Sequence, residues 1–144
     1  MNLKIIILVV VFCFAKSLLI GSQTLKIRII NIRNSNGQMC IAVFANDEEF
    51  NIEKPCWTTT CSKTQIVNNE MYIVIPVKPG RYAISVLDDE NKNGKMDYKL
   101  IRLPLEGFGF SNFIQKGLKK PKFKDFSIDI GILENSCLIA LKYF

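Results

Sequence analysis

The feature that most constrains the fold is the alternation of apolar and polar residues in short runs. Residues 25–29 alternate in the sequence LKIRI, and a similar period recurs in residues 123–130. A period of two places one face of a strand in a core and the other face in solvent. Turn signals, Asn-Gly at 36–37 and Pro-Gly at 79–80, separate such runs. Because no stretch beyond the first residues has a convincing helical period, strands must build the domain.

The spacing of these runs predicts an all-β fold of about seven strands. The expected strands are residues 25–32, 39–45, 64–67, 71–77, 81–87, 123–130 and 137–144. The polar stretch at 46–62 is predicted to be a loop. Short strands with frequent turns are typical of an antiparallel β-sandwich of the immunoglobulin-like or transthyretin-like kind.

Residues 1–22 have the character of a signal peptide. Lys4 precedes the apolar run at 5–15, which is too short to span a membrane. We expect cleavage near Gln23, with the remaining residues 23–144 forming a single β-sandwich domain. The expected location is therefore outside the cytoplasm, secreted or periplasmic in a bacterial envelope, with no transmembrane segment after processing.

Composition excludes several classes of function. The chain has no histidine, which removes His-based acid and base chemistry, Ser-His-Asp and Cys-His nucleophiles and most zinc sites. The formal net charge is +6, and it falls to +4 when Lys4 and Lys16 leave with the leader, since 17 Lys and Arg then face 13 Asp and Glu. This mildly basic balance is far from a nucleic-acid-binding signature. A lysine-rich run at 116–124 is either a solvated loop or a contact for an anionic surface such as lipopolysaccharide or an acidic glycan. We expect no nucleic-acid partner.

Four cysteines follow the leader: Cys40, Cys56, Cys61 and Cys137. An even number in an exported chain predicts two disulfides, with three possible connectivities. We favour Cys56 with Cys61, because they close a small loop, and Cys40 with Cys137, which would tie an early strand to the last one. Their spacing matches neither a paired zinc knuckle nor a CxxC redox motif.

The stretch at 89–97, DENKNGKMD, contains the main candidate for a functional site. Oxygen side chains occupy alternate positions and a glycine follows the third, as in the first part of an EF-hand-type calcium loop. In that register the ligands would be the side chains of Asp89, Asn91 and Asn93, the carbonyl of Lys95, and the carboxylate of Asp97, direct or through water.

The twelfth position of this loop is Leu100, where an EF-hand has a bidentate glutamate. Glu106 is the nearest downstream carboxylate that could replace it, and Asp88 is a further possible partner. Alternatively, the stretch is a metal-free turn held by Asx hydrogen bonds in a structural or assembly domain. A third possibility is a glycan hydrolase that uses Asp88 and Glu106, which would require two carboxyl groups about 5 to 10 Å apart across a cleft.

Residues 78–97, KPGRYAISVLDDENKNGKMD, and residues 103–112, LPLEGFGFSN, allow a family to be named. Together they resemble the bacterial secreted family known as domain of unknown function 2141, whose pattern runs roughly PGxYAxxxxHDxNxNGxxD and then GxPxEGxGFSN. The loop is also similar to the calcium loops of prealbumin-like repeats in bacterial surface adhesins. These resemblances imply a transthyretin-like sandwich and an envelope location.

The chain departs from the family pattern at three positions. The family's histidine is Asp88 here, a later asparagine is Lys99, and a glycine is Arg102. The oxygen-bearing positions of the loop are intact, so the resemblance supports calcium binding. The sequence therefore predicts an exported, non-enzymatic sandwich with a calcium loop, whose partner is an envelope glycan, lipopolysaccharide or a protein.

Overall fold

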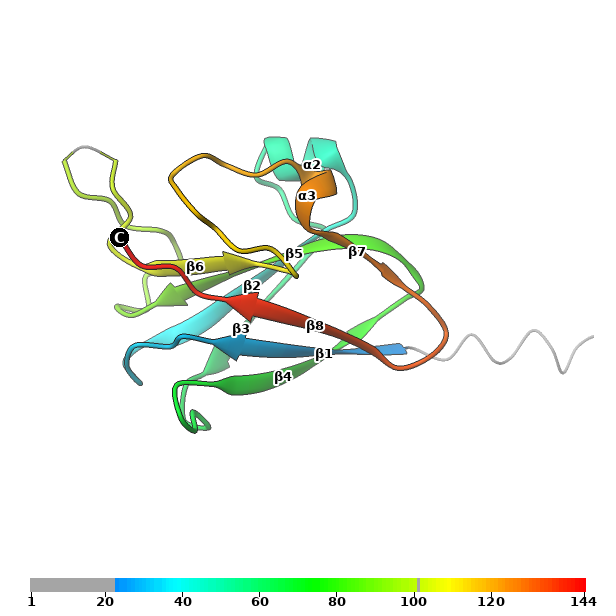
Figure 1. The fold of residues 1–144 in the computed structure, drawn as a ribbon, viewed down its shortest axis with the longest axis horizontal. Coiled ribbons are helices and arrows are strands. Elements are labelled where there is room, and N and C mark those ends of the chain that lie inside the picture. Colours follow the sequence, from blue (N-terminus) through cyan, green and yellow to red (C-terminus); the bar gives the residue numbers. More distant parts are fainter. Residues whose placement is uncertain (1–22, 101) are drawn as a thin grey trace, which may run out of the picture.

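The computed structural model describes residues 23–100 and 102–144, which form two packed β-sheets (Figure 1). The predicted signal peptide at 1–22 lies outside the described residues. The strands are β1 Gln23–Ile30, β2 Gln38–Phe44, β3 Trp57–Ser62, β4 Met71–Val77, β5 Gly80–Asp89, β6 Gly107–Phe110, β7 Ser127–Ile130 and β8 Asn135–Ala140. Two short helices are α2, Asp47–Asn51, and α3, Phe123–Phe126. Within this part of the chain, no helix has the length and apolar character needed to cross a membrane.

The two sheets have different strand orders. One has three strands in the order β4-β1-β8, and the other has the order β3-β2-β5-β6 with β7 also paired to β5. β5 is central, because it pairs with β2 over most of its length and with both β6 and β7. The predicted all-β sandwich is confirmed. Among the described strands, β1 and β8 depart from the antiparallel arrangement, because they pair in parallel.

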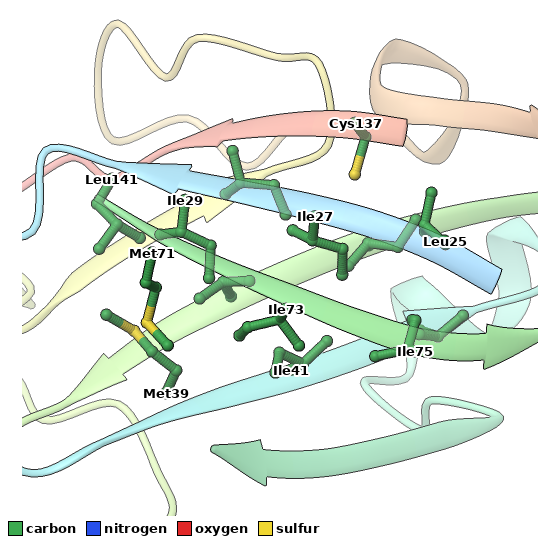
Figure 2. Packing of buried hydrophobic residues seen from close by; sticks show 14 of the residues in the cluster. Leu25, Ile27, Ile29, Met39, Ile41, Met71, Ile73, Ile75, Cys137 and Leu141 are labelled. Atoms are coloured by element: carbon green, nitrogen blue, oxygen red, sulfur yellow. The ribbon is translucent and has the colours of Figure 1, made fainter. Parts of the chain in front are cut away.

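The main core lies between the two sheets (Figure 2). Alternation along β1 buries Leu25, Ile27 and Ile29, whose exposed fractions are 1% or less. They meet side chains of β2 and β4, including Ile41 and Ile73. Each fully buried side chain of this size contributes about 1.5 to 3 kcal/mol relative to exposure. The period of two seen in residues 25–29 therefore places one face of β1 in the core between the sheets.

A second apolar cluster covers one end of the outer face of the five-stranded sheet. This phenylalanine cluster consists of Phe44, Phe50, Phe110 and Phe126. The ring of Phe126 lies 4.9 Å from the rings of both Phe50 and Phe110, measured between centroids. Because Phe50 belongs to α2 and Phe126 to α3, the cluster fixes both helices onto the sheet. The two helices lie together at the top of Figure 1.

The structure differs from the prediction in several segments. Strand β6, Gly107–Phe110, was not predicted, and the last strand ends at Ala140 rather than at residue 144. The expected loop at 46–62 contains α2 and β3, and α3 replaces the first half of the strand expected at 123–130. The strand expected at 64–67 is reduced to a single bridge between Val67 and Glu70. α2 forms because the side chain of Asn46 accepts the N–H of Glu49 at 2.9 Å, which caps the first turn.

Neither predicted disulfide forms, and the four cysteines Cys40, Cys56, Cys61 and Cys137 are free in the structure. Cys56 directly precedes β3 and Cys61 lies within it, so the extended backbone separates them by about 16 Å. A disulfide needs Cα atoms within about 7 Å. Cys137 belongs to the core between the sheets, whereas the thiol of Cys40 contacts Asp89 on the outer face. The thiols of Cys40 and Cys137 therefore lie on opposite sides of the five-stranded sheet.

We predict that Gly109→Ala destabilises the fold by about 1 to 3 kcal/mol. A Cβ atom at Gly109 would lie 2.6 Å from the carbonyl oxygen of Ala140, so the backbones of β6 and β8 would have to separate. Urea unfolding measures the effect. The matched control is Gly117→Ala, where an added Cβ meets no heavy atom within 4 Å. Equal stability of the two variants would contradict this packing.

Candidate functional site

An open groove of about 1030 Å³ lies on the outer face of the five-stranded sheet. Its floor has two rows of side chains that run across β3, β2, β5 and β6. The first row is Thr58, Ala42, Ser85 and Phe110, and the second is Thr60, Cys40, Leu87 and Phe108. Small side chains in the middle of each row leave the space that the larger ones border. The floor is therefore mostly apolar, with hydroxyl groups along β3 and β5.

The groove has two unlike ends. The phenylalanine cluster closes one end, with Phe50 and Phe110 in the lining. The other end is the connection from β5 to β6, which contributes Gly94, Lys95 and Met96. The groove therefore runs from an aromatic end to a polar end.

The connection after β6 forms a side wall. The amide Nε2 of Gln115 donates to the carbonyl oxygens of Gly117 and Lys119, which fixes the local path of the chain. The amide Oε1 of Gln115 is buried and has no hydrogen-bond partner in the described part of the chain. On the same side, Lys120 pairs with Glu53 at 3.0 Å and lies over the ring of Phe50.

The polar end is organised by Asp89, the last residue of β5. Its carboxylate accepts the backbone N–H groups of Asn93 at 3.0 Å and Gly94 at 2.9 Å, which bends the loop back over the strand. It also accepts the side-chain N–H of Gln38 at 2.7 Å. Burial raises the pKa of Asp89, but these donors together outweigh it and hold the pKa below its ordinary value. Asp89 is therefore a charged side chain with no exposed surface.

The other oxygen-bearing residues predicted as ligands also lie close together. The carboxylate of Asp97 accepts the side-chain N–H groups of Asn91 at 2.6 Å and Asn93 at 2.7 Å. The side-chain oxygens of both asparagines accept backbone N–H groups, from Asn93 and Lys95 respectively, in two successive Asx turns. The loop thus has the hydrogen bonds of the predicted turn, with the predicted ligands gathered in it.

Glu106, the downstream carboxylate suggested as a replacement ligand, lies directly before β6 and contacts this loop. Its carboxylate accepts the backbone N–H groups of Glu90 at 3.0 Å and Asp97 at 3.2 Å. Burial is the main reason why the pKa of Glu106 is raised, and the negative charges of Asp89 and Asp97 raise it further against those two donors. Within the described residues, no three acidic or cysteine side chains cluster tightly enough to hold a metal by themselves. A cation here would need amide and carbonyl oxygens or water as well.

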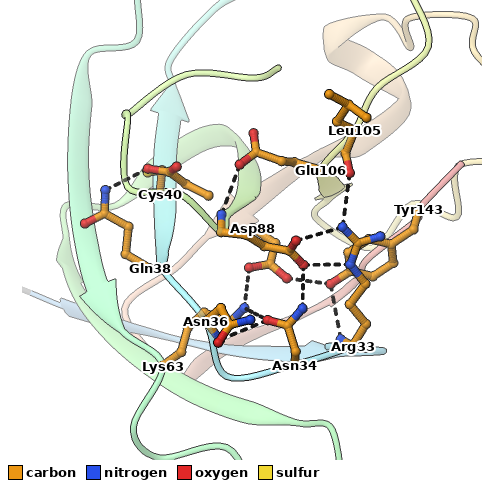
Figure 3. Close-up of polar contacts among 12 residues, drawn as sticks. Arg33, Asn34, Asn36, Gln38, Cys40, Lys63, Asp88, Leu105, Glu106 and Tyr143 are labelled. Carbon is orange, nitrogen blue, oxygen red and sulfur yellow. Dashed lines mark hydrogen bonds and ion pairs between the residues drawn. The ribbon is translucent and has the colours of Figure 1, made fainter. Parts of the chain in front are cut away.

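Asp88 has a different role from Asp89, because it points into the core at the same end of β5. Its carboxylate contacts Lys63 Nζ at 2.5 Å and accepts the hydroxyl of Tyr143 at 2.6 Å (Figure 3). The side chains of Lys63 and Asp88 have no exposed surface. Burial, and then the hydrogen bond to Asp88, raises the pKa of Tyr143. Lys63 and Tyr143 were not predicted to belong to this group, because neither carries a local signal of burial.

A second ion pair joins this buried group to the loop. Arg33 binds Glu90 through two hydrogen bonds, of 2.6 and 2.8 Å, and also lies over the ring of Tyr143. Asn34 donates to the same carboxylate at 2.8 Å. The hydrogen bonds from Arg33 are the main reason why the pKa of Glu90 is held below its ordinary value of 4.5. The start of the loop is therefore tied to the β1–β2 connection.

We predict that Lys63→Met destabilises the protein by about 3 to 5 kcal/mol, because it leaves the buried Asp88 carboxylate without its cation. Chemical unfolding measures the loss. Adding Asp88→Asn to this variant removes the uncompensated charge and should recover part of the stability. A loss below about 1 kcal/mol for Lys63→Met would contradict a buried, paired Lys63.

We also predict that Glu90→Gln flattens the loss of stability in acid. A carboxyl group with a lowered folded pKa contributes stability above its unfolded pKa, and this contribution is lost as the pH falls through the folded value. Unfolding free energies between about pH 6 and 3 should therefore fall less steeply in Glu90→Gln than in the unchanged protein. Glu134→Gln, an exposed substitution, serves as the control. Parallel curves for all three proteins would refute the contribution of Glu90.

A comparison with known protein families supports the resemblance inferred from residues 78–112. No curated protein and no solved structure matches the chain, so the immunoglobulin-like or transthyretin-like character of the sandwich stays a prediction. One family model matches residues 27–136, which is most of the chain. Its description is an uncharacterized protein conserved in bacteria. The chain therefore belongs to the bacterial family of domain of unknown function 2141.

Proposed function

We propose that this protein is an exported, non-enzymatic binding domain of the bacterial envelope, in which a calcium ion stiffens one end of the binding groove. The observation that carries the proposal is the groove itself, which lies between the Asp89 loop and the phenylalanine cluster. A concave, mostly apolar site with a few polar groups is the usual form of a ligand-binding site. Of the residues named for the metal, Lys95 lines the groove, and the others lie in or beside the connection from β5 to β6 that forms its polar end.

The charge balance of the loop supports calcium. Asp89, Asp97 and Glu106 lie at the ends of the connection from β5 to β6 or within it. The negative charges of Asp89 and Asp97 are part of the reason for the raised pKa of Glu106. A divalent cation would remove the repulsion between these charges. Calcium prefers carboxylate, amide and carbonyl oxygens, which are the groups present. The loop residues would hold the ion, and its contribution would be rigidity of the groove wall rather than chemistry.

The position of Asp88 favours a binding role over the hydrolase alternative. That alternative needs the carboxyl groups of Asp88 and Glu106 to face a substrate across a cleft. Asp88 is instead fully buried in its pair with Lys63, and Glu106 is occupied by two backbone N–H groups. A substrate could reach Asp88 only if the core opened. An envelope glycan, lipopolysaccharide or a protein remains the proposed partner.

We expect about 5 mM calcium to raise the melting temperature by several degrees over EDTA. A site with a Kd on the order of 10⁻⁴ to 10⁻³ M would stabilise the folded state by about 1 to 2 kcal/mol at this concentration. The measurement is thermal unfolding of the purified, processed protein. Magnesium at the same concentration should have a smaller effect, because it demands a more regular site and keeps its waters.

Asp89→Ala is the decisive variant for this prediction, and Glu134→Gln is its control. Asp89→Ala lowers the melting temperature by itself, since two loop N–H groups lose their acceptor, so the relevant quantity is the calcium-dependent shift. That shift should vanish in Asp89→Ala and persist in Glu134→Gln. Identical curves in calcium and EDTA for the unchanged protein would favour the metal-free structural domain.

A further inference from the structure

We infer that the groove binds an anionic amphiphile, in which an acyl chain lies across the sheet and a carboxylate or phosphate head sits at the loop end. This inference rests on the proposed function, because it names the ligand class of the same groove. It goes beyond that function by fixing both the chemistry and the orientation of the ligand.

The floor and the aromatic end fit an acyl chain. The middle of the floor has the small side chains of Ala42, Cys40 and Ser85, and Leu87 and Phe108 border it on β5 and β6. Beyond them the groove ends against Phe50 and Phe110 of the phenylalanine cluster. A volume of about 1030 Å³ exceeds what one chain of sixteen carbons fills, if each carbon takes about 30 Å³, the share of a water molecule in the liquid. Burial of each methylene contributes about 0.8 kcal/mol.

The loop end fits an anionic head. Lys95 and Arg102 line this end, both are exposed, and neither has an ion-pair partner in the part of the chain that the structure describes. The other two charged residues of the lining, Glu53 and Lys120, neutralise each other at 3.0 Å. The lining therefore has two uncompensated positive charges, and both belong to the connection between β5 and β6. The carboxylates of Asp89, Asp97 and Glu106 lie outside this lining, so charge complementarity with Lys95 and Arg102 orients the ligand with its head toward the loop.

The test is displacement of cis-parinaric acid, a fluorescent acyl carboxylate, from the purified protein. Palmitate and hexadecyl phosphate should displace the probe at micromolar concentration, and hexadecanol should compete about tenfold more weakly because it lacks the charge. Comparing the carboxylate with the phosphate distinguishes a fatty acid from a phospholipid or lipid A as the natural source. Inorganic phosphate alone should not compete. Displacement by tetragalacturonate but not by palmitate would overturn the proposal in favour of an acidic glycan.

A charge-reversing double variant tests where the head of the ligand lies. The double change Lys95→Glu with Arg102→Glu should weaken palmitate at least about tenfold and leave hexadecanol unchanged. Its control, Lys54→Glu with Lys78→Glu, makes the same change of charge at exposed residues outside the lining. Unchanged palmitate binding in the first double variant would overturn the orientation of the ligand.

A second substitution tests the floor without disturbing the core. Thr58→Phe fills the groove from an exposed position on β3 and should weaken both palmitate and hexadecanol, whereas Thr24→Phe places the same ring on the outer face of the other sheet. Equal binding by these two variants would overturn the groove as the site.

Calcium separates this inference from the proposed function. A calcium-dependent shift in melting temperature without palmitate binding would reject the amphiphile alone. Palmitate binding of equal strength in calcium and in EDTA would support the amphiphile as the ligand. It would contradict the proposal that a calcium ion stiffens the end of the groove.

Discussion

The structure depends on two adjacent carboxylates at the end of β5, Asp88 and Asp89, which point to opposite faces of the sheet. Successive side chains of a strand point to opposite faces, so Asp88 turns inward to Lys63 and Asp89 turns outward to Gln38 and the loop. Both are fully buried. A buried charge is tolerated only when it is paired and hydrogen-bonded. Each carboxylate therefore imposes its own set of partners, one in the core and one at the groove.

This division links the core of the sandwich to the proposed site. The inward carboxylate fixes Tyr143, whose ring lies under Arg33, and Arg33 in turn binds Glu90 at the start of the loop. The outward carboxylate fixes the N–H groups that curl the same loop over the end of the groove. The loop is thus anchored from both faces of one strand. Such anchoring suits a wall that must keep its shape while a ligand comes and goes.

The parts of the structure that were predictable from the sequence have local signals. Strand β1 follows from its alternation, strands β2, β4 and β5 follow from apolar runs bounded by turn signals, and the loop follows from its Asx and glycine spacing. Lys63 was not predictable, because its partner Asp88 is distant in sequence and a buried lysine has no local pattern. The disulfide prediction was wrong because extended backbone separates Cys56 from Cys61 and because Cys40 and Cys137 lie on different faces of the five-stranded sheet. Helix α2 did have a signal, Asn46 followed by Glu49, which is a capping pattern at a helix start.

The groove itself was the least predictable feature. Its floor is assembled from four strands, so it exists only once the register between them is known. The same register determines which residues a bound ligand would contact. The most direct test of the proposed sites is amide NMR mapping of labelled protein titrated with calcium and then with palmitate. If the loop binds calcium and the groove binds the amphiphile, calcium-induced shifts are confined to residues 89–97 and Glu106, and palmitate-induced shifts lie along the floor at Cys40, Ala42 and Leu87. Shifts confined to the outer face of the three-stranded sheet, or no shifts at all, would contradict both proposals.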